Sequence, residues 1–310
     1  MSKMRFVLAR SSVLVACLGA SAPGCLPDDT RPPPASVVVN VMAARSLIEG
    51  IPASSTADGW SIAFDRFLLS IGHASLDGDA CTTYSEDHYG RILDMRRPEP
   101  QRVGIVYGLG QCDFGFRVSN PSGDSLLGNG VTEQDKTRMR TPGPDAYANM
   151  RGISLELAGR AVRGGVIKTF AWSFRQRIFY RECAAGPDAG GARGLALHGN
   201  EAVAVNIVVD GEALFQVGLD AATAKLYFDH FAEADDQYGD KDGAVTLDEL
   251  ASVPLADIAS MAESIDAGVG TNTWKTLEDY VYLGLVPRLA RFQGDGTCTL
   301  GVGDRRRGGD

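Results

Sequence analysis

Residues 60–71 read Trp-Ser-Ile-Ala-Phe-Asp-Arg-Phe-Leu-Leu-Ser-Ile, and this stretch decides the fold class. Its first half alternates large apolar residues with small or polar ones, which places Trp60, Ile62 and Phe64 on one face of an extended chain. On a helix Ile62 would point away from Trp60 and Phe64, because helical side chains share a face every three to four residues. The stretch therefore predicts a half-buried β-strand.

The same β pattern continues on both sides of this strand, from about residue 35 to residue 215. Further strands are predicted at 36–41, 103–107, 114–118, 153–157, 166–180 and 202–209. The joints between them are clusters of Gly, Pro, Asn and Asp, which favour turns. Because short strands follow one another with a single small helix at 132–140, which Thr132 begins in a capping box with Asp135, we expect an antiparallel β-sandwich-like domain at 36–219.

The pattern changes to helix after residue 220. The alanine-rich segment 221–234 suits a helix, 246–253 predicts a helix that ends before Pro254, and Thr276 begins a capping box before 280–285. The fold class is thus mainly β, with a helical C-terminal portion at 220–300. Within it, residues 291–300 are expected to return to an extended conformation, and the last residues, 301–310, are predicted to be a disordered tail.

Composition and charge exclude several classes of protein. With 44% hydrophobic and 22% charged residues, the chain is neither wholly disordered nor a polytopic membrane protein. Its 30 basic and 39 acidic residues give a net charge of −9. Such a chain repels phosphate backbones, so no nucleic-acid partner is expected.

The N-terminus reads as an export signal. Residues 1–10 are basic, and residues 11–22 are apolar but too few to cross a bilayer, which needs roughly 20. The small residues before Cys25 resemble the lipobox of bacterial lipoproteins, although Ala22-Pro23 departs from the commoner Leu-Ala or Leu-Ser. The resemblance implies a signal peptide at 1–24 and a lipidated Cys25 that anchors the protein to a membrane.

Two alternatives to this anchor remain open. A second lipobox-like sequence ends at Cys17 but leaves a very short apolar segment, and an ordinary secretory signal would leave Cys25 unmodified. Residues 25–35 are proline-rich and suit a semi-rigid tether. Leu26 follows the cysteine where an inner-membrane retention signal would have aspartate. We therefore expect an outer-membrane, lipid-anchored protein that faces the periplasm or the cell surface.

Four cysteines remain for the folded part: Cys81, Cys112, Cys183 and Cys298. An even number in an exported chain predicts two disulfides, for which three connectivities are possible. We favour Cys81–Cys112, which would join neighbouring strands, and Cys183–Cys298, which would tie back the tail. The C-x-x-C spacing is absent, so a zinc or iron–sulfur site is not expected.

One motif carries recognisable chemistry. Residues 235–249 read Asp-Asp-Gln-Tyr-Gly-Asp-Lys-Asp-Gly-Ala-Val-Thr-Leu-Asp-Glu and resemble the calcium-binding loop of EF-hand proteins. Around the turn glycine Gly243, the loop positions that supply oxygen ligands match Asp240, Asp242, Ala244 through its carbonyl, Thr246 and Glu249. The resemblance implies that calcium is the cofactor and that it has a structural role.

The loop departs from this pattern at its start. Counting back from Gly243, the first position falls on Tyr238, which cannot replace an aspartate. Asp236 or Asp235 would take that role if the first half of the loop contains an insertion, and Asp236 is the residue we assign. Two other outcomes stay open: a degenerate loop without an ion, and a site for a different divalent cation.

The remaining residues suggest two further hypotheses. His73 and His88 lie near several acidic residues in sequence, so a periplasmic copper- or zinc-binding protein is the alternative. G-x-S-x-G, H-E-x-x-H and P-loop motifs are absent, so we do not expect an enzyme. A hydrolase with a site assembled from distant residues is the third hypothesis.

The leading hypothesis is an envelope-anchored lipoprotein with a binding or structural role, stabilised by one calcium ion. Its layout of a lipobox, a β-domain and an aspartate-rich loop resembles lipoproteins of myxobacteria and their relatives. That resemblance implies no activity, and the envelope protein or polysaccharide that would be its partner is not identified by the sequence.

Overall fold

The computed structural model describes residues 32–85, 88–143, 152–187, 190–219, 223–258 and 274–302. The expected signal peptide, Cys25, most of the tether and residues 303–310 of the tail lie outside these ranges. Residues from Pro33 onward form one compact unit by their contacts.

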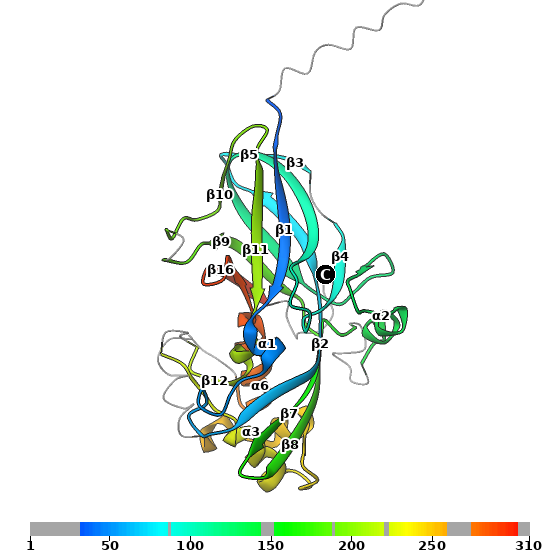
Figure 1. Ribbon diagram of the computed structural model, residues 1–310, viewed down its shortest axis with the longest axis vertical. Coiled ribbons are helices and arrows are strands. Elements are labelled where there is room, and N and C mark those ends of the chain that lie inside the picture. Colours follow the sequence, from blue (N-terminus) through cyan, green and yellow to red (C-terminus); the bar gives the residue numbers. More distant parts are fainter. Residues whose placement is uncertain are drawn as a thin grey trace, which may run out of the picture. The chain divides into compact units, whose positions relative to one another are not determined.

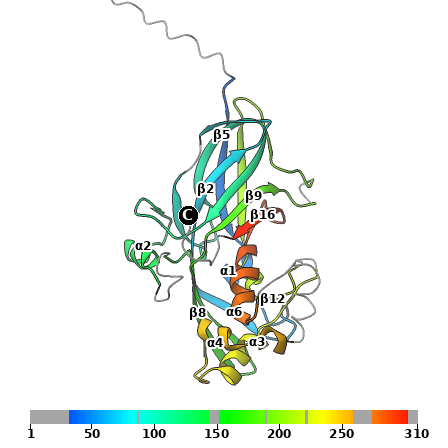
Figure 2. The same ribbon diagram turned by 180° about the vertical axis from the view of Figure 1, so that it is seen from behind.

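The protein is mainly β, as predicted, and its strands form a large curled sheet (Figures 1 and 2). The strands are β1 (Ala35–Ala43), β2 (Ser61–Asp77), β3 (Cys81–Ser85), β4 (Gly90–Asp94), β5 (Gln101–Val118), β6 (Leu126–Leu127), β7 (Leu155–Arg163), β8 (Val166–Phe174), β9 (Ile178–Ala184), β10 (Leu195–Leu197), β11 (Ala202–Val209), β12 (Gln216–Val217), β13 (Lys225–Leu226), β14 (Ala244–Val245), β15 (Ala290–Phe292) and β16 (Thr297–Val302). The main path of the sheet runs β14-β8-β7-β2-β5-β1-β11-β15, while β12 and β13 form a separate pair.

Two long strands produce the curl. Strand β2 pairs with β7 along its first half and with β4 and β5 along its second half. Strand β5 pairs first with β1 and then, past Asp113, with β2 and β9. Because each strand passes from one set of neighbours to another, the sheet bends along both of them. The two strands predicted at 103–107 and 114–118 are therefore one continuous strand, β5.

The sheet is mixed in direction. Most neighbours are antiparallel, but β1 pairs with β11, β4 with β6 and β14 with β8 in parallel. The segment predicted as one strand at 166–180 is divided into β8 and β9. At the break, the Arg175 amide donates to the Tyr282 hydroxyl at 2.6 Å, and the Gln176 side chain donates to the Tyr282 carbonyl at 2.6 Å. These bonds draw the chain away from β7.

The helices are short and lie mostly in the C-terminal third. They are α1 (Arg45–Glu49), α2 (Glu133–Arg140), α3 (Asp229–Glu233), α4 (Leu247–Ser252), α6 (Leu277–Asp279), the π-helical turns η3 (Ala234–Tyr238) and η5 (Tyr280–Leu285), and the 3₁₀ turns η2 (Gly211–Phe215), η4 (Leu255–Asp257) and η6 (Val286–Arg288). Thr132 and Thr276 begin helices through capping boxes, as predicted, and so does Thr246. None of the helices in the described ranges has the length and apolar character needed to cross a bilayer.

The C-terminal third differs from its predicted helical texture. Only residues 229–233 of the segment 221–234 form an α-helix within the described chain, and they continue into a π-helical turn. Residues 290–292 and 297–302 are strands of the sheet, which agrees with the extended conformation expected at 291–300. The tail assignment was wrong for its first two residues, because Gly301 and Val302 pair with β9. Hydrogen bonds to β9 and β11 thus return the chain's end to the sheet.

The core begins at the stretch that decided the fold class. Trp60, Ile62 and Phe64 are all buried, as the alternation predicts. Phe64 lies 6.0 Å from Phe170 between ring centroids, and Trp172 lies 5.5 Å from Phe231 of α3. These aromatic contacts join β2 and β8 to the helices beside β8 (Figure 2), so a single apolar core serves sheet and helices.

Both disulfides form as we predicted. Cys81 bonds to Cys112, and Cys183 bonds to Cys298. The first joins β3 to β5, and the second joins β9 to β16. Each one therefore connects hydrogen-bonded neighbouring strands.

Substitution of His230 by leucine is expected to flatten the dependence of stability on pH below neutrality. His230 is buried without a partner for Nε2, and burial lowers its pKa from 6.5 to about 4 despite Asp58 and Asp229 nearby. The unfolded chain binds a proton between these values and the folded chain does not. The stability that this group contributes is therefore fully present above pH 6.5 and is lost as the pH falls toward 4. The total loss is about 3 kcal/mol.

Urea unfolding at several pH values measures this effect as the difference between wild type and variant. His198→Gln is the control, because that histidine is exposed. If the free energy of unfolding depended on pH in His230→Leu as it does in wild type, the assignment of this effect to His230 would be wrong.

Candidate functional site

The aspartate-rich loop begins in a π-helical turn. Helix α3 continues into η3, and a π-helical turn accommodates more residues than an α-helical one. Tyr238, the residue that occupies the first loop position by strict counting, lies at the surface and donates its hydroxyl to Asp257 at 3.0 Å. Asp235 is instead fully buried. The turn therefore absorbs the insertion and directs Asp235 inward.

Three carboxylates converge at this loop. Ligand oxygens of Asp235, Asp240 and Glu249 all lie within 4.8 Å of one another. They come from η3, from the loop and from α4, so three segments meet at one point. Of the residues we assigned as ligands, the structure brings together Asp240 and Glu249 and adds Asp235 in place of Asp236.

Hydrogen bonds to backbone amides hold the three carboxylates. Asp235 Oδ2 accepts from the Gly243 amide at 3.1 Å, Asp240 Oδ1 from the Asp242 amide at 3.2 Å, and Glu249 Oε2 from the Thr246 amide at 2.8 Å. Glu249 Oε1 also accepts from the Asp240 amide at 3.3 Å, so within the described residues the oxygens of the group left without a donor are Asp235 Oδ1 and Asp240 Oδ2. These bonds also fix the loop's conformation, with Gly243 at a φ of 87° that favours glycine.

The other oxygen of Asp235 has no donor. Oδ1 is buried and lacks a hydrogen-bond partner in the described structure. A buried carboxylate oxygen without a donor is destabilising, because folding removes its water without replacement. A bound cation would satisfy it.

Lys168 is the positive charge already present beside the cluster. Its ammonium donates to Asp235 Oδ2 at 2.5 Å and to Asp236 Oδ1 at 2.6 Å, and its side chain is 6% exposed. Burial alone would lower the pKa of Lys168, but the hydrogen bonds to both aspartates outweigh burial and raise it. Asp236 is thus directed to Lys168, and the ammonium competes for Asp235 with any metal ion.

The remaining assigned ligands surround the cluster. Asp242 is exposed and accepts from the Ala244 amide at 2.7 Å. Ala244 belongs to β14, which pairs in parallel with Thr169 and Phe170 of β8. Thr246 caps α4, and its hydroxyl also contacts Glu249 Oε2 at 3.0 Å. The loop is therefore joined to the sheet on the side that Lys168 occupies.

The two histidines considered for a transition metal approach each other, but in basic surroundings. His73 lies on β2, and burial together with Arg117, His88 and Arg177 lowers its pKa to about 4. Asp77 is directed to the neighbouring Gly78 amide. Within the described ranges, Asp235, Asp240 and Glu249 are the one group of three potential metal ligands.

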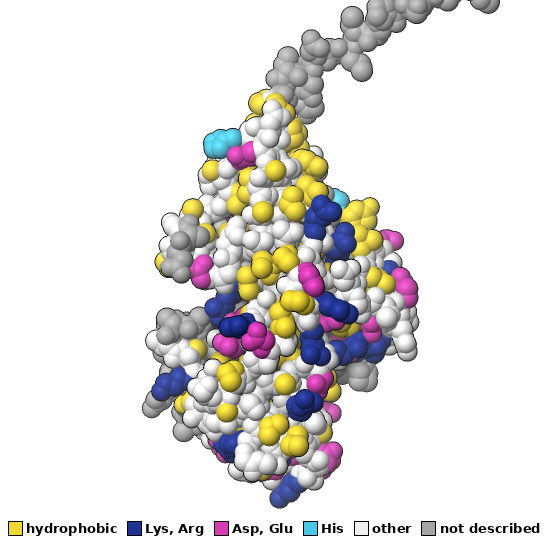
Figure 3. Space-filling view, in the orientation of Figure 1, with side chains coloured by type: hydrophobic (Ala, Val, Ile, Leu, Met, Phe, Trp, Pro, Cys, Tyr) yellow, Lys and Arg dark blue, Asp and Glu magenta, His cyan; other side chains and the backbone are white. Residues whose placement is uncertain are grey.

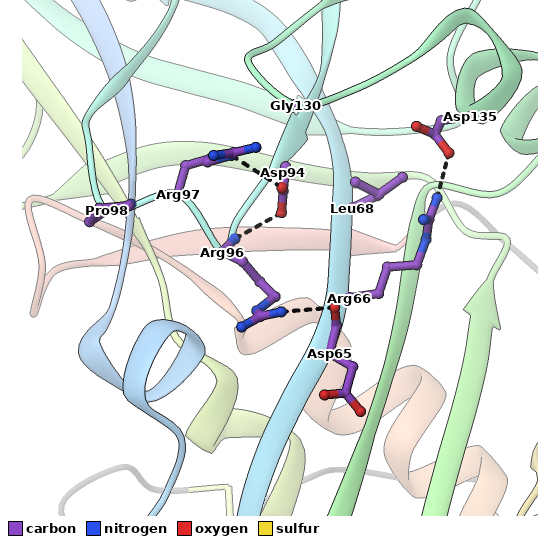
Figure 4. Close-up of a pocket in the computed structure, with 9 residues that line it drawn as sticks. All are labelled: Asp65, Arg66, Leu68, Asp94, Arg96, Arg97, Pro98, Gly130 and Asp135. Carbon is purple, nitrogen blue, oxygen red and sulfur yellow. Dashed lines mark hydrogen bonds and ion pairs between the residues drawn. The ribbon is translucent and has the colours of Figure 1, made fainter.

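A surface pocket of about 360 Å³ lies between β2, β4 and α2 (Figure 4). Figure 3 shows Lys and Arg side chains gathered over this region. The lining residues are Asp65, Arg66, Leu68, Asp94, Arg96, Arg97, Pro98, Gly130 and Asp135. Arg97 pairs with Asp94 at 3.4 Å, and Arg96 donates to the Asp65 carbonyl at 3.0 Å. The charged groups of this pocket therefore largely satisfy one another.

Four of the charges near this pocket attach α2 to the sheet. Arg66 and Arg138 each contact both Asp135 and Glu156, at distances between 2.6 and 2.9 Å. Burial would raise the pKa of Asp135, but hydrogen bonds from Arg138, Thr132 and Arg66 outweigh it and hold that pKa well below its ordinary value. A carboxyl so strongly ionised does not suit a proton donor, and the network acts as a structural clamp.

Sequence analysis did not identify Lys168 or the arginine network. A signal for Lys168 was nevertheless present, since it shares one face of β8 with Phe170, Trp172 and Phe174, where a charge requires a buried partner. Comparison of the chain with protein-family models, with curated proteins and with solved structures found no match. Its function is therefore inferred from its own residues and their geometry.

Proposed function

We propose that this protein is a lipid-anchored envelope protein with a binding or structural role, and that Asp235, Asp240 and Glu249 hold one structural calcium ion. The observation that carries the calcium site is the convergence of three carboxylates, one of which, Asp235, has a buried oxygen without a donor. The anchor rests on the lipobox-like sequence before Cys25 and on the proline-rich tether.

The donor chemistry favours calcium among the metals. The group offers carboxylate oxygens and no sulfur or nitrogen, which suits a hard cation. Calcium accepts six to eight oxygens in flexible geometry, whereas magnesium requires near-ideal octahedral geometry. Asp242, the Ala244 carbonyl, Thr246 and water are the proposed sources of the remaining ligands.

The ion would join an EF-hand-like helical portion to a β-sandwich-like domain. The loop contacts β8 through the β14 pairing and through Trp172, whose Nε1 donates to the Val245 carbonyl at 2.9 Å. A cation shared by η3, the loop and α4 would hold these segments against that strand. Outside the cytosol calcium is steady, so a structural role fits better than a switch.

The two other hypotheses receive less support. A copper or zinc site at His73 and His88 would have Arg117 and Arg177 as neighbours, and these arginines repel a cation. A hydrolase would require a catalytic group in a pocket such as that at Arg66, where the charged groups are paired.

Thermal unfolding of the full chain with a chelator and with calcium tests the site. We expect calcium to raise the melting temperature by about 5 °C at saturating concentration, since a ligand that binds only the folded state stabilises it. Asp240→Asn and Glu249→Gln should abolish most of this rise. Both are nearly isosteric, and glutamine can still serve at the third position of the capping box.

Asp248→Asn is the matched control, because Asp248 is an exposed carboxylate one residue before Glu249. It should leave the calcium-dependent rise unchanged. Equal melting temperatures in calcium and chelator, with no heat of binding by calorimetry, would refute the proposed site.

A further inference from the structure

A second cluster of charges, all basic, lies where β2, β5 and β9 adjoin. Arg117 of β5 is opposite Gly72 of β2 on one side and Phe179 of β9 on the other. His73 follows Gly72, and Arg177 directly precedes β9. Three neighbouring strands therefore bring these three basic side chains to one place, remote in sequence from the aspartate-rich loop.

A β-bulge sets the position of His73. The register between β2 and β5 shifts between Gly72 and Ser75, and His73 has a φ of 54°, in the left-handed region. Its amide donates to the Tyr89 carbonyl at 3.2 Å. A histidine rarely adopts this backbone conformation, and such strain concentrates at functional sites. The bulge places His73 close enough to Arg117, His88 and Arg177 to interact with all three.

Among the described residues, the cluster has no acid that compensates its charge. Within the described residues, no carboxylate forms an ion pair with Arg117, Arg177 or His73, and Arg117 Nε is buried without a hydrogen-bond partner. Burial and Arg177 together lower the pKa of Arg117. Like charges gathered at a partly buried site are unfavourable without a counter-charge, in a chain that otherwise has an excess of acids.

An aromatic ring and a third arginine extend the same face. Arg117 and Arg181 lie over the ring of Phe179, at 5.9 and 5.0 Å from its centroid. Arg177, Phe179 and Arg181 alternate along the chain, so they share one face of β9. Phe179 thus contacts two guanidinium groups on this face.

We propose that Arg117, Arg177 and His73 form a binding site for a phosphate or sulfate group. Guanidinium forks match the paired oxygens of such groups, and the orphaned Arg117 Nε gains an acceptor. Two arginines, with a histidine that becomes protonated on binding, match the charge of a doubly charged anion. A ligand with a single carboxylate would neutralise less of their positive charge. The group is either a free ion or part of a lipid headgroup, and the site is independent of the calcium loop.

NMR titration of His73 in the full chain tests the proposal directly. The chain has four histidines, so each ring signal is assigned by replacing one histidine with glutamine. In chloride we expect His73 to titrate near 4, and in sulfate at equal ionic strength toward its ordinary 6.5. Arg117→Gln or Arg177→Gln should weaken sulfate binding at least tenfold, the effect of a lost charge-assisted hydrogen bond.

Controls separate specific binding from screening and from misfolding. Arg45→Gln, which removes an exposed arginine paired with Glu49, should leave the sulfate effect intact. Arg177 is exposed, so its variant keeps the test valid if Arg117→Gln fails to fold. A pKa of His73 that is equal in sulfate, phosphate and chloride would overturn the proposal.

Vesicles identify the source of the anion. Arginine-dependent binding to phosphatidylglycerol vesicles, without such binding to phosphatidylcholine vesicles, would indicate a lipid headgroup. Sulfate and phosphate effects on His73 without arginine-dependent vesicle binding would indicate a free ion. Either result supports a site for the same anionic group.

Discussion

Replacing Cys183 and Cys298 together by alanine is expected to lower the free energy of unfolding by about 5 kcal/mol. This disulfide closes a loop of 115 residues, and in the chain-entropy description the constraint on the unfolded chain grows with loop length. The loop contains α3, η3 and the aspartate-rich segment, so the unfolded chain would gain freedom over the whole C-terminal third. Urea unfolding of wild type and double variant measures the difference.

The other disulfide provides an internal comparison. Cys81 and Cys112 are 31 residues apart, so their joint replacement by alanine should cost less, about 3.5 kcal/mol. Each pair connects adjacent strands, and each contains one fully buried cysteine, Cys112 or Cys183. A larger loss for the shorter loop would show that local packing, and not chain entropy, dominates.

Local patterns predicted the parts of the fold that depend on local physics. Alternation identified β2 from residues 60–64, because the side chains of a strand alternate between faces. Capping boxes identified the starts of helices at Thr132 and Thr276, because side chain and amide satisfy each other within four residues. The Cys183–Cys298 pairing was chosen because it returns the end of the chain, and β16 does pair with β9.

Long-range features were not predictable in the same way. The parallel pairing of β1 with β11 joins segments about 165 residues apart, and no local pattern encodes it. Separate strands were predicted at 103–107 and 114–118, yet β5 continues through the glycines at 108 and 110 that lie between them. At Gly108 a Cβ would overlap the Leu76 side chain, so this glycine serves a close contact and not a chain break.

The same distinction between local and long-range features applies to the candidate site. The loop pattern located Asp240 and Glu249, since their spacing from the turn glycine follows from how a short loop surrounds an ion. The choice between Asp235 and Asp236 depended on the π-helical turn η3 and on Lys168, which is 67 residues before Asp235. Both are properties of the tertiary structure.

Substitution of Asp235 by asparagine is expected to destabilise the protein by about 3–5 kcal/mol even when calcium is absent. The change leaves the Lys168 ammonium, 6% exposed, with Asp236 as its remaining carboxylate, and breaking one side of a buried ion pair carries this cost. It also removes the negative charge of one proposed calcium ligand, so calcium is expected to bind more weakly and not to compensate. Urea unfolding should give the variant the same stability in calcium and in chelator, so its loss relative to wild type should be larger in calcium by the amount that calcium stabilises wild type.

Lys168→Met is expected to behave differently, and the contrast decides what neutralises the cluster. In chelator the variant leaves Asp235 buried without its cation, so a loss of similar size, about 3–5 kcal/mol, is expected. In calcium most of the loss should be recovered, because the ion replaces the ammonium without competition. The calcium-induced rise in melting temperature should then exceed that of wild type. If Lys168→Met instead lost the same stability in both conditions, Lys168 would be the permanent counter-charge of a loop that binds no ion.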